Sequence, residues 1–167
     1  YAYVLVNGGK DEEYPDAVMT IKNATVYGNT NGMIAADGGR LIVEGGIYTL
    51  GDGTADNLWR MVYTSGNGEV EISGGTFCKN VAGIDKGFFG GSGGVISVAD
   101  GSFEDKIHEN VYIDSGKVSI SGGSFENGLS KQNAAEVEVS GGTFSQPVPD
   151  NLCADGFTAE AEQPNGT

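Results

Sequence analysis

The sequence predicts an all-β fold, a right-handed parallel β-helix (solenoid) of about six coils, on the basis of three observations. One short motif recurs along most of the chain. Glycine is very common, with 29 residues among 167, whereas proline accounts for only 4. No stretch shows the sustained apolar periodicity of a helix. Hydrophobic residues make up 38% of the chain, more than is usual for a disordered sequence, so we expect the glycines at repeated tight corners.

The repeated motif consists of two apolar residues in alternation, a Ser-Gly-Gly corner, and then Thr or Ser before an aromatic residue. Its clearest copies are residues 68–77, 116–125 and 137–144, and its weaker copies are residues 19–26, 41–48 and 96–103. Successive corners lie roughly 20 to 30 residues apart, which suits a coil of three short strands and three bends. Asn23 and Asp100 replace the first glycine of the corner. Because Asn and Asp tolerate positive φ best among non-glycine residues, this first position is expected to be left-handed.

Stacked coils place equivalent residues above one another, about 4.8 Å apart, and strand alternation sorts these residues into inward and outward columns. The first inward column is Met19, Leu41, Val70, Ile96, Val118 and Val137; the second is Ile21, Val43, Ile72, Val98, Ile120 and Val139; the aromatic column is Val26, Tyr48, Phe77, Phe103, Phe125 and Phe144. We expect Phe125 to be fully buried between its two neighbours in the aromatic column.

The length indicates a single domain, residues 1–167. It divides into an N-terminal strand and acidic loop (1–18), the repeat coils (19–144), and a C-terminal cap and tail (145–167). A solenoid needs covered ends, because a bare last coil offers unpaired N–H and C=O groups. The prolines and Gly156 predict a short helical turn in the cap, followed by a final strand from Phe157.

The composition argues against two classes of partner. The formal net charge is −14, and such a field repels nucleic-acid backbones and anionic lipid surfaces. No apolar run approaches the ~20 residues needed to cross a bilayer. We therefore expect no nucleic-acid partner and no membrane insertion. The acidic, glycine-rich and β-branched composition is typical of a secreted or cell-surface module, and we interpret the chain as a fragment of a larger protein or a mature chain.

The two cysteines are expected to be free thiols. Cys78 and Cys153 lie at least three coils apart, which corresponds to roughly 14 Å along the solenoid. A disulfide requires Cα atoms within about 7 Å of each other.

No group of residues points to a catalytic centre, so we expect neither an enzyme nor a cofactor. Polysaccharide lyase or glycosidase activity stays open, because the acidic residues are too numerous to choose a catalytic pair. Asp52, Asp56 and Asn57 form a weak calcium candidate, but they lack the ligand alternation of an EF-hand and fit a turn better. His108, the single histidine, is expected to be a solvated loop residue.

The best candidates for a binding surface are large side chains in the segments that lengthen two of the coils. They are Trp59, Arg60, Tyr63, Phe88, Phe89 and Tyr112. Trp, Tyr and Arg dominate interface hot spots, and the repeat itself does not require them here. We expect a footprint centred on residues 51–64 and 80–91, with Tyr112 at its edge. The alternative is that Trp59 and Phe88 fill the core where the coil widens.

The Ile-Ser-Gly-Gly-Thr-Phe unit at residues 72–77 and the closure from Phe144 to Phe157 resemble a known group of repeats. They are similar to right-handed parallel β-helix regions in large surface proteins of gut Firmicutes, and some of those proteins are similar to immunoglobulin-binding superantigens. The resemblance covers residues 19–157. It implies the β-helix fold and a host-protein partner, with immunoglobulin as one candidate. It assigns no functional residue, since the shared motif is structural.

These observations favour a non-catalytic secreted or cell-surface module that binds a host protein, and the resemblance implies a bacterial surface. Two alternatives stay open: a carbohydrate-binding or vestigial polysaccharide-lyase-like β-helix, and a structural spacer within a large adhesin.

Overall fold

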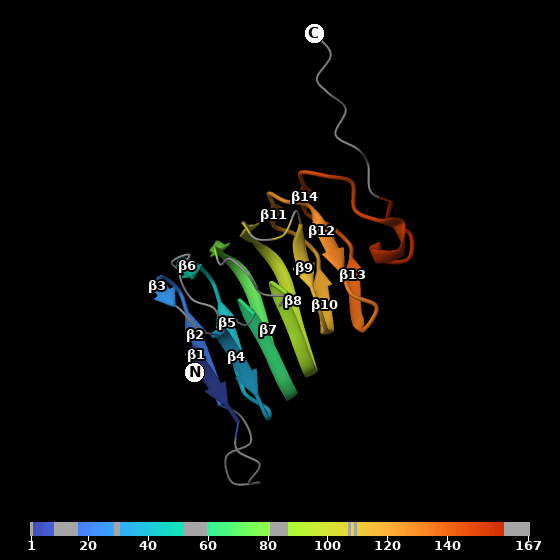
Figure 1. Cartoon of the computed structure of the whole chain (residues 1–167). Coiled ribbons are helices and arrows are strands. Elements are labelled where there is room, and N and C mark those ends of the chain that lie inside the picture. The colour runs from blue at the N-terminus through green and yellow to red at the C-terminus, as the bar shows by residue number, and fades with distance from the viewer. Residues whose placement is uncertain are drawn as a thin grey trace.

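The computed structural model describes residues 2–8, 17–28, 31–51, 60–80, 87–106, 108 and 110–158. These residues form a parallel β-solenoid of about four turns (Figure 1). The all-β class and the parallel solenoid are therefore confirmed. The count of six coils, the right-handed sense and the division into cap and coils stay predictions. Within the described residues, no helix is long and apolar enough to span a membrane.

The described residues contain strands β1 (Ala2–Asn7), β2 (Val18–Ile21), β3 (Thr25–Gly28), β4 (Asn31–Ala36), β5 (Arg40–Val43), β6 (Ile47–Leu50), β7 (Val62–Lys79), β8 (Phe89–Asp105), β9 (Val111–Ile113), β10 (Gly116–Ile120), β11 (Ser124–Phe125), β12 (Leu129–Lys131), β13 (Ala135–Val139) and β14 (Thr143–Phe144), and the 3-10 turn η1 (Asp150–Leu152).

The strands stack as three parallel ladders, which we call the first, second and third faces. The first face contains β1, β4, the start of β7, the start of β8, β9 and β12. The second contains β2, β5, the middle of β7, the middle of β8, β10 and β13. The third contains β3, β6, the ends of β7 and β8, β11 and β14. Strands β7 and β8 bend around both corners, so each contributes to all three faces.

The predicted inward columns stack in register on the second face. Met19 pairs with Leu41, Leu41 with Val70, and Val70 with Ile96. The column continues through Val118 and Val137. Its central members are at most 1% exposed, as expected for a packed core. The two end members are less buried: Met19 is 42% exposed, and Val137 is only partly buried.

The aromatic column is the densest part of the core. Tyr48, Phe77, Phe103, Phe125 and Phe144 stack with ring centroids 4.8–5.0 Å apart. This spacing follows from the distance between stacked strands. Phe125 is 1% exposed and lies between Phe103 and Phe144, as predicted.

The sequence predicted a left-handed residue at the first position of the corner, and this prediction is wrong by one position. Positive φ occurs at the second corner residue, for example 111° at Gly75 and 95° at Gly123. Neither Asn23 nor Asp100 has positive φ, and Asp37 is the one described non-glycine residue that does. The first glycine is needed for space instead: a Cβ at Gly122 would lie 2.1 Å from the carbonyl oxygen of Ala99 on the adjacent coil.

An irregularity in register accommodates Asp100 at this crowded first position. Ile72 pairs with Val98, but the next pair is Ser73 with Asp100, so Ala99 has no partner in the β7 ladder. The Asp100 carboxylate then accepts a hydrogen bond from the N–H of Gly101 at 2.8 Å.

The serine of the motif joins one coil to the next. The hydroxyls of Ser73, Ser121 and Ser140 donate to backbone carbonyl oxygens of the adjacent coil at 3.3–3.4 Å. Each acceptor belongs to the last inward residue of the second face before the corner, such as Val43 for Ser73. The corner therefore combines close backbone contact, a left-handed residue and a side-chain hydrogen bond.

The C-terminal segment covers the last coil. After η1, Cys153 forms a parallel bridge with Val139, and the N–H of Ala154 donates to the Val139 carbonyl at 2.8 Å. Val148 and Leu152 are 6% and 2% exposed. Phe157 is 53% exposed, and the strand expected to begin there is absent at residues 157–158. Cys78 and Cys153 are both free, as predicted.

We predict that Gly122→Ala destabilises the chain far more than Gly156→Ala. The Cβ at Gly122 meets backbone atoms that cannot move independently, so the loss should reach or exceed about 3 kcal/mol. Gly156 has φ of 85° but nothing within 4 Å of the added Cβ. Its substitution should therefore cost only the backbone strain, about 1–2 kcal/mol. Urea unfolding followed by circular dichroism measures both, and equal losses would contradict the close-approach argument.

Candidate functional site

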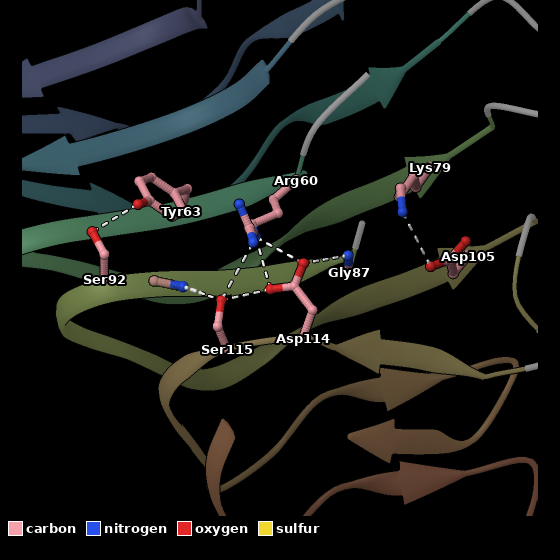
Figure 2. Close-up of polar contacts among 9 residues, drawn as sticks. Arg60, Tyr63, Lys79, Gly87, Ser92, Asp105, Asp114 and Ser115 are labelled. Carbon is pink, nitrogen blue, oxygen red and sulfur yellow. Dashed lines mark hydrogen bonds and ion pairs between the residues drawn. The ribbon is translucent and has the colours of Figure 1, made fainter. Parts of the chain in front are cut away.

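Polar side chains from several coils meet beside the corner between the third and first faces. Arg60 precedes β7, Gly87 precedes β8, and Asp114 and Ser115 follow β9. Lys79 and Asp105 end the long strands β7 and β8 on the third face. Figure 2 shows that these residues form two neighbouring ion-paired groups.

The first group is centred on the ion pair between Arg60 and Asp114. Arg60 Nε donates to both carboxylate oxygens of Asp114, at 2.7 and 2.9 Å (Figure 2). The two side chains are only 14% and 7% exposed. The Arg60 side chain crosses Gly90, where an added Cβ would lie 2.2 Å from Nε. A glycine at position 90 is thus what allows the arginine to reach a carboxylate 54 residues away in the chain.

Asp114 is held as a carboxylate by its surroundings. Its oxygens also accept hydrogen bonds from the Ser115 hydroxyl at 2.6 Å and from the Gly87 N–H at 2.9 Å. Burial by itself would raise the pKa of Asp114. The hydrogen bonds from Arg60, Gly87 and Ser115, together with the charge of Arg60, outweigh burial and lower that pKa below its ordinary value.

Arg60 also orders the aromatic side chain beside it. Its guanidinium carbon lies 5.1 Å from the centre of the Tyr63 ring, within the range of a cation–π contact. The Tyr63 hydroxyl makes a 2.7 Å hydrogen bond with Ser92 on the adjacent coil. Tyr63 is therefore held at the face of its ring and at its hydroxyl while staying partly exposed.

The second group lies deeper and contains Lys79, Asp105 and His108. Lys79 Nζ lies 3.7 Å from Asp105 Oδ2, and the side chains are 2% and 0% exposed. Burial lowers the pKa of Lys79, although the charge of Asp105 opposes that shift. His108 Nδ1 lies 2.8 Å from the same Asp105 oxygen. The interpretation of His108 as a solvated residue is wrong: its side chain is 24% exposed, and its ring lies 5.0 Å from that of Tyr112.

The structure brings together only part of the predicted binding surface. Arg60 and Tyr63 are in direct contact, and Tyr112 is partly exposed beside His108. Phe88 and Phe89 are 0% exposed, which corrects their assignment to a binding surface. Their rings pack against each other and against Phe103 at 5.0–6.1 Å, so they fill the core, as the alternative for Phe88 proposed.

Several predicted residues lie outside the described part of the chain. These are Trp59, the calcium candidates Asp52, Asp56 and Asn57, and much of the expected footprint. Among the described residues, no group of three or more His, Cys, Asp or Glu side chains could hold a metal ion.

The sequence analysis missed the buried charges, although strand alternation could have revealed them. Phe77 and Phe103 point inward, so Lys79 and Asp105, two residues later, must also point inward. Their opposite charges on paired strands satisfy each other. No comparable signal identifies Asp114, because it lies just beyond a short strand and pairs with a residue outside the repeat.

Comparison of the chain with family models, with curated proteins and with solved structures finds no match.

We predict that Asp114→Asn lowers the free energy of unfolding by about 3–5 kcal/mol at neutral pH, because it leaves the mostly buried Arg60 without a counter-charge. The folded-state pKa of Asp114 is depressed, so its stabilising effect is complete above the unfolded pKa of about 4 and is lost as the pH falls below that value. The difference between parent and variant should shrink from pH 5 towards about pH 2 in urea titrations. Glu138→Gln, at an exposed site on β13, is the matched control and should change little. A pH-independent difference would contradict the assignment.

We predict that Thr64→Val stabilises the chain by about 1 kcal/mol. Thr64 is 0% exposed, and its hydroxyl oxygen has no hydrogen-bond partner in the described structure. Valine has nearly the same shape and removes the cost of burying that hydroxyl. Thr76→Val at an exposed position on the third face should have little effect. Thermal unfolding compares the two, and a lower melting temperature for Thr64→Val would show that the hydroxyl is satisfied in solution.

Proposed function

We propose that this chain is a non-catalytic, secreted or cell-surface module that binds a host protein through the first face around Tyr63. The proposal includes the finer architecture expected from the sequence, six coils with a right-handed sense. The motif recurs in register at six levels of the second face, which supports the coil count, and the strong preference for right-handed parallel crossovers supports the hand.

The observation that carries the proposal is the fixed Arg60–Tyr63 pair. Asp114 holds the guanidinium, the guanidinium lies over the Tyr63 ring, and Ser92 holds the Tyr63 hydroxyl. Both side chains are therefore already ordered before a partner arrives. Such preorganisation reduces the entropy lost on binding, and Tyr and Arg are the residue types most common at hot spots.

The surroundings of Tyr63 suit a flat protein surface. Leu5, Ile34 and Tyr63 are in register on consecutive strands of the first face. Leu5 is 56% exposed, and Ile34 and Tyr63 are partly exposed. The neighbouring row contains only the small or polar residues Asn7, Ala36, Ser65 and Ser92. A row of apolar side chains thus lies beside a row of short, small or polar side chains. Such a mixture of apolar and polar surface is usual at protein interfaces.

The state of the carboxylates favours binding over catalysis. Asp105 is completely buried beside Lys79 and His108, so it is poorly placed to contact a substrate. Asp114 accepts hydrogen bonds from Arg60, Ser115 and Gly87 and is held ionised at neutral pH. A general acid or base needs a pKa near the working pH and access to the substrate, and neither residue combines these properties.

Immunoglobulin is the first partner to test, because the Ile-Ser-Gly-Gly-Thr-Phe repeats resemble those of surface proteins related to immunoglobulin-binding superantigens. Serum and mucus proteins provide the wider set of candidates. A glycan partner or a pure spacer role remains the alternative to be separated by experiment.

We predict that Tyr63→Ala weakens binding to a partner recovered from serum or mucus by at least tenfold, with little change in melting temperature. Removing a hot-spot tyrosine costs more than about 1.4 kcal/mol of binding free energy, which corresponds to this factor. Surface plasmon resonance against immunoglobulin and each recovered protein measures the effect. Tyr27→Ala is the matched control, since Tyr27 is 75% exposed on the third face.

Three outcomes would contradict this proposal. Equal affinities of the Tyr63 and Tyr27 variants would exclude the surface around Tyr63. Binding to a glycan array with no protein partner would support the carbohydrate-binding alternative. Absence of binding to both proteins and glycans would support the spacer. Arg60→Ala is unsuitable for this test, because it also removes the counter-charge of Asp114.

A further inference from the structure

The two ends of the solenoid differ in how they are closed. At the C-terminal end, Cys153 bridges Val139, and Val148 and Leu152 are buried against the core. Val139 is accordingly only 5% exposed although it belongs to the last paired strand of its ladder. In Figure 1 this closing segment lies beyond β13, at the opposite end of the solenoid from β1, β2 and β3.

At the N-terminal end, the described strands have a free edge. β1 pairs only with β4, β2 only with β5, and β3 only with β6 among the described residues. A parallel strand inside the solenoid is paired on both sides, as β5 is with β2 and β7. The outer edges of β1, β2 and β3 therefore present backbone donors and acceptors suited to another strand.

The inward columns are also uncovered at this end. Met19 is 42% exposed, whereas its neighbour Leu41 in the same column is 0% exposed. Ile21 and Val26 are partly buried, whereas Val43 and Tyr48, their partners on the next coil, are 0% exposed. These side chains keep the inward direction of their columns but lack a layer above them.

The exposed large hydrophobic residues gather at this end of the molecule. In the described chain they are Leu5, Val18, Met19, Tyr27, Ile47 and Phe157. All except Phe157 belong to β1, β2, β3 or β6, the strands of the first two levels of the stack. Only Met19 among them belongs to an inward column. Leu5, Val18, Tyr27 and Ile47 alternate with inward residues and point outward from the sides of these coils, so Met19 is the residue that reports on the open end.

We propose that this N-terminal end is an interaction surface for a further parallel coil of polypeptide, with apolar residues above Met19, Ile21 and Val26. This inference is independent of the binding function proposed for the first face. Backbone edges require a strand as partner, and the open inward columns require apolar side chains in the register of the coils. The interface would continue the contact already repeated between β2, β5 and β7.

A second copy of this chain fits the surface less well. Among the described residues β12 and β14 also pair on one side only, but the segment from Val148 to Cys153 covers the second face at the C-terminal end, so a coil cannot stack there on all three faces. Contact between two N-terminal ends would reverse the strand direction and bring together two molecules that each carry a formal net charge of −14. We therefore assign the surface to a parallel coil and leave self-association as an outcome of the test.

The test adds one coil of the chain's own sequence. Residues 111–128 span one coil, because Val111 pairs with Leu129. Fused directly ahead of Ala2, this segment would bring the added Ile113 into register with Val4 and the added Val118 above Met19. The matched control carries Val118→Asp and Ile120→Asp in the added segment only, which places charges at the inward positions.

Oxidation of Met19 by hydrogen peroxide reports directly on this surface. The chain has three methionines, and Met33 and Met61 are 0% exposed, so Met19 should react first in the parent. We expect the added coil to slow Met19 oxidation at least tenfold, measured by mass spectrometry, and to raise the melting temperature. The control segment should do neither.

Two results would overturn the inference. Met19 oxidation as fast with the added coil as without it, or equal protection by the control segment, would show that the end does not accept a coil. Sedimentation of the parent as a dimer, with Met19 already protected, would assign the surface to a second copy.

Discussion

Hydrogen bonding between the backbones of successive coils is the constraint on which this structure depends. It sets the strand spacing, so inward side chains must stack directly above their equivalents, and this produces the aromatic column with centroids 4.8–5.0 Å apart. It also brings the corners into backbone contact. The first corner glycine leaves room for the carbonyl of the adjacent coil, and the second adopts the positive φ that turns the chain.

The same stacking gives the molecule a rigid surface on which residues distant in sequence are neighbours. Arg60 reaches Asp114 because Gly90, on the coil between them, has no side chain in its path. The pair is mostly buried, and separating two buried charges costs much free energy, so the arginine side chain keeps one position. Tyr63 is ordered as a consequence. The proposed binding surface is thus a product of coil stacking and owes little to loop flexibility.

A stack of coils also has two ends, and they pose the same physical problem. Each terminal coil has strand edges and core side chains that an internal coil would hide. The segment around η1 solves this problem at one end with a bridge to Val139 and buried Val148 and Leu152. The other end keeps Met19 and its neighbours exposed, which is why we assign a partner to it.

The sequence by itself determined the parallel solenoid, the residues of each column, the buried position of Phe125 and the two free cysteines, because these depend only on the repeat and on strand alternation. It predicted the left-handed corner residue one position too early, since neither Asn23 nor Asp100 has positive φ, and Asp100 fits the crowded site through a change of register. Only the tertiary structure placed Phe88 and Phe89 in the core, joined Arg60 to Asp114, and set the half-buried His108 against Asp105. These residues lie where coils are lengthened or strands end, so no sequence periodicity fixes the direction of their side chains. The space available in the core and the free-energy cost of an unpaired buried charge decided that direction.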